Sequence, residues 1–175
     1  LLAVMDNTAT AMGGRLLQRW LNRPLRRLDT LQARQQAILE LQADYRYESS
    51  ATALQNIGDI ERILARIALR SARPRDLARL RDSLAVLPEL HATLGTTSAP
   101  RLSVLSTQVS TFPKLVSLLN KAVIENPPVV IREGGVIAEG FDSELDELRA
   151  ISTNAGDYLI ALEKREREAS GIATF

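Results

Sequence analysis

At 175 residues, the chain can form one domain, or one domain with a protruding arm. Its apolar content of 45% with only 4% aromatics indicates a core of aliphatic side chains, and the lack of cysteine excludes disulfides and thiolate metal sites. The net charge of +1 is unevenly divided, because residues 1–124 hold 17 basic and 10 acidic side chains (net +7) and residues 125–175 hold 5 and 11 (net −6).

The first part of the sequence predicts three helices. Leu1–Thr10 is expected to be extended, and Thr10 is a suitable N-cap for a helix that ends before Pro24. Asp29 is expected to cap a second helix, and a weaker third helix follows near Ala51–Asn56. The first helix has one apolar face, made of Met12, Leu16, Leu17, Trp20 and Leu21.

Two stronger helices occupy the middle of the sequence. Gly58-Asp59 is typical of a stop followed by an N-cap, and Pro74 suits the first turn of the next helix. Pro88 is expected to kink that helix without ending it, because the apolar pattern continues beyond it. Shorter helices are expected near Arg101–Val109 and Pro113–Ile124. The apolar positions of the two stronger helices are Ile60, Ile63, Leu64 and Ile67, then Leu77, Leu80, Leu84, Leu87, His91 and Leu94.

The last part predicts a small β-hairpin and a long helix. Two apolar runs near 128–138 flank Gly134-Gly135, which is typical of a hairpin turn. A helix of about 45 Å is expected from Asp142 onward, and beyond Leu162 it becomes charged on all sides. Its apolar stripe is Phe141, Leu145, Leu148, Ser152, Ala155, Leu159 and Leu162. The predicted fold class is all-α: a mainly helical core bundle with one hairpin and a long C-terminal helix.

Residues for catalysis are scarce. His91 is the single histidine and falls on an apolar seam, so a core or boundary position explains it better than catalysis. Gly134-Gly135 lacks the Lys-Ser or Lys-Thr that a phosphate-binding loop requires. The carboxylates at the start of the last helix suit its dipole; they are Asp142, Glu144, Asp146 and Glu147. We therefore predict no catalytic, cofactor or metal site.

An arginine run is the best candidate for a phosphate-facing patch. It includes Arg62, Arg66, Arg70 and Arg73. Acids are interleaved, so the excess over residues 59–82 is only +3. Ion pairing within the protein explains the run at least as well as contact with nucleic acid does. Both interpretations stay open from the sequence.

Several composite motifs resemble, in the same order, the core domain of the DNA mismatch-repair protein MutS. They lie at Thr8–Leu25, Gly58–Arg66, Ala72–Leu77, Leu87–Leu90 and Pro127–Arg149. The similarity spans essentially the whole chain. It implies the first part of a core/lever domain, with residues 1–140 as the helical core and residues 141–175 as a lever helix leading toward a clamp domain that is absent here.

The resemblance also implies a function. Such a domain is not itself an enzyme; it relays between an ATPase, which uses ATP and Mg, and a DNA clamp. The implied partners of the intact protein are mismatched duplex DNA and a second copy of itself, in the bacterial cytoplasm at the nucleoid. We expect little DNA binding by this chain alone and no membrane association. The implied lever packing residues are Phe141, Leu145, Leu148, Leu159 and Leu162. The alternative is a free-standing helical adaptor that binds a protein partner through its last helix.

Overall fold

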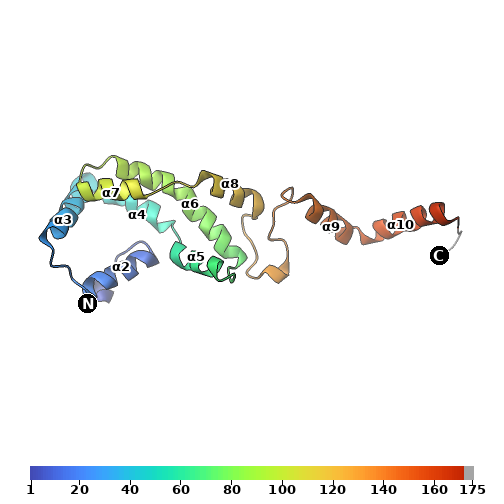
Figure 1. The fold of residues 1–175 in the computed structure, drawn as a ribbon, viewed down its shortest axis with the longest axis horizontal. Helices are drawn as coiled ribbons and strands as arrows, with labels where there is room; N and C mark the ends of the chain where they lie inside the picture. The colour runs from blue at the N-terminus through green and yellow to red at the C-terminus, as the bar shows by residue number, and fades with distance from the viewer. Residues whose placement is uncertain (172–175) are drawn as a thin grey trace. The chain divides into compact units, whose positions relative to one another are not determined.

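The structure is a computed structural model that describes residues 1–171 (Figure 1). It is mostly helical, which confirms the predicted all-α class, and residues 1–171 contain no β-strand. The chain divides into two compact units, Leu1–Val136 and the remainder from Ile137. Within the described residues, every helix is too short or too polar to span a bilayer.

The N-terminal helices largely follow the prediction. Helix α2 (Ala11–Asn22) begins at Thr10, whose hydroxyl accepts the Gly13 N–H at 2.9 Å. The segment before it is not wholly extended, because a short helix, α1, covers Leu2–Met5. Helix α3 (Leu28–Gln42) begins one residue before Asp29, so the predicted cap is wrong. Asp29 instead lies in the first turn, where its negative charge complements the helix dipole.

A tight turn separates α3 from the following helices. The 3-10 turn Ala43–Tyr45 leads into α4 (Tyr47–Gln55), which is longer than predicted. Helix α5 (Ile60–Ala68) then begins at Asp59, whose carboxylate accepts the Arg62 N–H at 3.3 Å. This confirms the predicted Gly-Asp stop and cap.

Helix α6 (Pro74–Gly95) is the central element of the first unit. It packs against α4, α5, α7 (Pro100–Gln108) and α8 (Pro113–Ala122), which lie along it in Figure 1. The helix continues through Pro88, as predicted. Its buried seam shifts beyond the proline, because Leu90 is buried and His91 is exposed. The predicted core or boundary position of His91 is therefore wrong.

Two aliphatic clusters form the interior of this unit. The larger lies between α5, α6 and α8, and the smaller between α3 and α7. Glu40 on α3 accepts the backbone N–H groups of Ser98 and Ala99 just before α7 begins, which fixes the start of that helix against α3. The buried members are Ile63, Leu80, Leu84, Leu119 and Val123 in the larger cluster, and Ala37, Ala99 and Leu102 in the smaller.

The predicted hairpin near 128–138 does not form. A 3-10 turn at Ile131–Glu133 precedes Gly134 and Gly135, whose φ angles are +75° and +64°. The backbone of this segment pairs with the end of α8, because the Ile124 N–H donates to the Val136 carbonyl at 3.1 Å. Pro127-Pro128 lacks two N–H donors, which weakens any ladder within the segment.

The second unit contains two helices where one long helix is predicted. Helix α9 covers Ser143–Thr153 and α10 covers Ala155–Ser170. They are separated at Asn154, whose φ and ψ of −112° and 37° are not helical. The surrounding Ser, Thr, Asn and Gly residues have weak helix propensity, which accounts for the break.

Candidate functional site

An arginine–carboxylate cluster joins two of the conserved-order motif segments, on α2 and at the start of α5. The Arg15 guanidinium donates to both carboxylate oxygens of Asp59 at 2.7 Å each, and to Glu61 at 2.6 Å. A planar guanidinium matches a carboxylate in this two-bonded geometry, so the pair fixes orientation as well as distance. Since residues 11–22 include no buried side chain, Arg15 is a principal attachment of α2.

Asp59 has two roles in this cluster. It caps α5 and also receives Arg15, and its side chain is only 19% exposed. The hydrogen bonds from Arg15 lower the pKa of Asp59 to about 2, with a smaller contribution from the Arg62 N–H. The same hydrogen bonds raise the pKa of Arg15. Asp59 therefore stays ionised, and the attachment of α2 persists, at all physiological pH values.

A second ion pair joins α5 to α6. The Arg66 guanidinium donates to both oxygens of Asp76, at 2.8 and 2.5 Å. Asp76 also accepts the backbone N–H of Arg73, which lies just before α6. The hydrogen bonds from Arg66 lower the pKa of Asp76. This carboxylate holds the start of α6 and the face of α5 together.

The predicted arginine patch thus consists of residues in different environments. Arg66 is committed to Asp76, and Arg62 lies 3.4 Å from Asp59. Within residues 1–171, Arg70 and the Arg73 side chain have no carboxylate partner. Arg70 has a φ of +54° at the turn that ends α5. Ion pairing within the protein accounts for half of this set.

Two buried polar side chains in α6 were missed by the sequence analysis. Arg81 is 8% exposed and donates to the carbonyls of Val123, Ile124 and Glu125, each at 3.2 Å. It thereby satisfies the carbonyls where α8 ends. An arginine within a run of arginines gives no signal for burial. Only the distant chain that it contacts distinguishes it.

Ser83 is the second buried polar residue, with no exposed surface. Its hydroxyl accepts the Gly58 N–H at 2.8 Å and donates to the Arg79 carbonyl at 2.6 Å. Gly58 has no room for a side chain, since a Cβ there would lie 2.7 Å from the Arg79 side chain. The Gly58-Asp59 motif therefore also marks a close contact between the chain and α6.

The predicted lever stripe is exposed within its own unit. Phe141 is 43%, Leu148 57% and Leu159 61% exposed, while Leu145 and Leu162 are half-buried. None of the side chains in residues 143–170 is buried. The stripe is therefore an apolar surface to which another element can bind.

The acidic cluster at the start of α9 has structural partners. Asp142 caps the helix by accepting the Leu145 N–H at 2.9 Å. Asp146 accepts the Gly140 N–H at 2.7 Å and pairs with Arg149 at 3.0 Å. In residues 1–171 no three His, Asp or Glu side chains are grouped to hold a metal ion.

The fold and these contacts define an all-helical module whose charged side chains mainly join its own elements. The sequence matches the family of MutS domain III over residues 1–172, and the chain belongs to this family. Domain III is the core domain of the mismatch-repair protein MutS, and the ATPase lies in a different domain.

Proposed function

We propose that this chain acts as the coupling domain of a MutS-type mismatch-repair protein, relaying between the ATPase and the part that holds DNA. Family membership supports a role in mismatch repair. The exposed stripe on α9 and α10 supports the relay, because it offers an apolar face to another helix. Two packed helices move together, so displacement at one end is passed along their length.

Other features of the chain agree with this role. The ion pairs of Arg15 and Arg66 join α2, α5 and α6 into one unit, which suits a part that moves as a rigid body. In the intact protein we expect mismatched duplex DNA and a second copy of the protein as partners. We favour this role over the free-standing adaptor, because the family match covers residues 1–172.

The experiment uses the intact MutS protein with a fluorescently labelled mismatched duplex. Leu148→Ala shortens the stripe, and Glu147→Ala, at the adjacent exposed position, is the matched control. We expect ATP-triggered release of the duplex to slow several-fold in Leu148→Ala, with mismatch affinity and ATP hydrolysis retained. The control should release DNA at the parental rate. Unaltered release by a Leu148→Ala protein that has measurably lost stability would contradict the proposal.

A further inference from the structure

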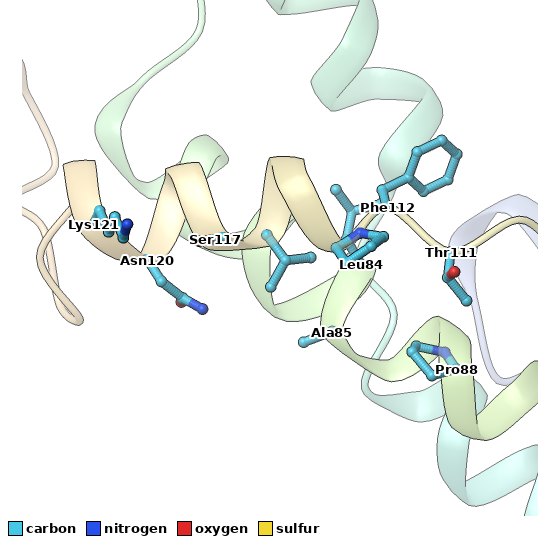
Figure 2. Close-up of a pocket in the computed structure, with 10 residues that line it drawn as sticks. Leu84, Ala85, Pro88, Thr111, Phe112, Ser117, Asn120 and Lys121 are labelled. Carbon is cyan, nitrogen blue, oxygen red and sulfur yellow. The ribbon is translucent and has the colours of Figure 1, made fainter.

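A hollow between α6 and α8 is the largest recess of the first unit that the arginine cluster does not use. It has a volume of about 560 Å³ and runs along α8 from Phe112 at the start of the helix to Lys121 near its end (Figure 2). Leu84, Ala85 and Pro88 form the α6 side. Volumes of this size and mainly apolar walls are typical of binding sites for side chains or small molecules.

The α6 wall has a feature that favours an occupant. Pro88 lies within the helix and has no N–H to donate to the Leu84 carbonyl, one turn earlier. Both residues line the hollow. At the opposite wall, Phe112 is 45% exposed and Leu118, further along α8, is 51% exposed. Apolar surface is therefore open to solvent both in the hollow and beside it.

The charges around the hollow identify the kind of occupant. Residues 90–124 contain Arg101, Lys114 and Lys121 but no aspartate or glutamate. In residues 1–171 none of these three cations is paired with a carboxylate, whereas Arg15, Arg62 and Arg66 are. Lys121 also lines the hollow. An apolar groove with unpaired cations at its rim is complementary to apolar side chains flanked by carboxylates.

We propose that the hollow is a docking surface for an acidic amphipathic helix of a partner protein, which inserts apolar side chains one turn apart between α6 and α8. Its carboxylates pair with Lys121 and the neighbouring cations. This is the helix-in-groove mode of recognition, with apolar anchors in the groove and charges at the rim. The inference goes beyond the proposed coupling role, which depends on α9 and α10.

The test measures binding of a labelled synthetic helical peptide to the 175-residue chain by fluorescence anisotropy. The peptide carries leucines at positions i and i+4 among glutamates, and a control peptide has lysines in place of the glutamates. Ala85→Trp fills the hollow from an exposed position of α6. Ser103→Trp, at an exposed position of α7 outside the hollow, is the matched variant. Circular dichroism checks that each variant keeps its helices.

We expect Ala85→Trp to weaken binding of the acidic peptide by roughly tenfold or more, and Lys121→Glu by several-fold, while Ser103→Trp binds as the parent does. The lysine peptide should bind at least about tenfold more weakly than the acidic one. Equal binding of both peptides, or unchanged binding by a folded Ala85→Trp, would overturn the proposal. So would binding of duplex DNA or anionic vesicles that is lost in Lys121→Glu while the acidic peptide does not bind.

Discussion

The two units of this chain show that the same kind of apolar pattern leads to different results. In residues 1–136, leucines and isoleucines spaced by three and four residues close into two buried clusters around α6. In α9 and α10 a comparable stripe stays exposed, because the described part of this unit offers no second layer to cover it. A pattern thus identifies the face of a helix that can be buried, and the neighbouring elements decide whether it is.

The largest effect should come from the core of the first unit. Leu84 is 6% exposed within the larger cluster, so Leu84→Ala removes buried apolar surface and leaves a cavity. We expect the free energy of unfolding to fall by about 2–5 kcal/mol, measured by urea denaturation of the chain. Leu64→Ala on α5 is the control, because Leu64 is 52% exposed and should cost well under half as much.

Arg81→Met should have the next largest effect. Methionine keeps the bulk of the side chain but donates no hydrogen bond to the three carbonyls at the end of α8. We expect a loss of about 2–3 kcal/mol, because unsatisfied buried carbonyls are costly. Arg101→Met, at an exposed position of α7, should be close to neutral. Equal stability of the two variants would show that Arg81 does not hold α8 in place.

Ser83→Ala should have an intermediate effect. It leaves the buried Gly58 N–H without its acceptor, and the expected cost is about 1–2 kcal/mol. Ser103→Ala is the matched control on an exposed helix face. Hydrogen exchange provides a second readout, since the Gly58 amide should lose protection in Ser83→Ala alone.

These positions also show what the sequence could predict. The caps at Thr10 and Asp59 and the continuation of α6 through Pro88 follow from local chemistry, and the structure confirms them. The buried Arg81, by contrast, depends on residues 123–125, which are distant in sequence. The hairpin failed for a similar reason: Gly134-Gly135 supplied a turn, but the segment found its backbone partner at Ile124.

A smaller effect that depends on pH is expected for the attachment of α2. Because the folded pKa of Asp59 is about 2 and the unfolded value is near 3.8, the ionised group stabilises the fold above pH 4. This contribution should be lost as the pH falls from 4 toward 2. Asp59→Asn retains a capping side chain, so we expect it to cost about 1 kcal/mol at pH 7.

The pH dependence of Asp59→Asn is the decisive part of that measurement. Its difference from the parent should shrink toward zero near pH 2, because protonated Asp59 also lacks the charge that Arg15 pairs with. The control is Asp44→Asn, since no ion pair of Asp44 occurs in the described residues. A difference between Asp59→Asn and the parent that is constant from pH 7 to pH 2 would rule out the Arg15 ion pair as its source.

The smallest effect in the chain should be Leu148→Ala, and this variant tests the comparison between the units most directly. Leu148 is 57% exposed on α9, so its truncation should change the stability of the chain by less than about 0.5 kcal/mol. If the stripe is covered in the intact MutS protein, the same substitution there should cost about 2–5 kcal/mol. Thermal denaturation of both forms, with Glu147→Ala as control, measures the contrast. Equally small effects in both forms would mean that the stripe stays uncovered, and the coupling role would then need another point of contact.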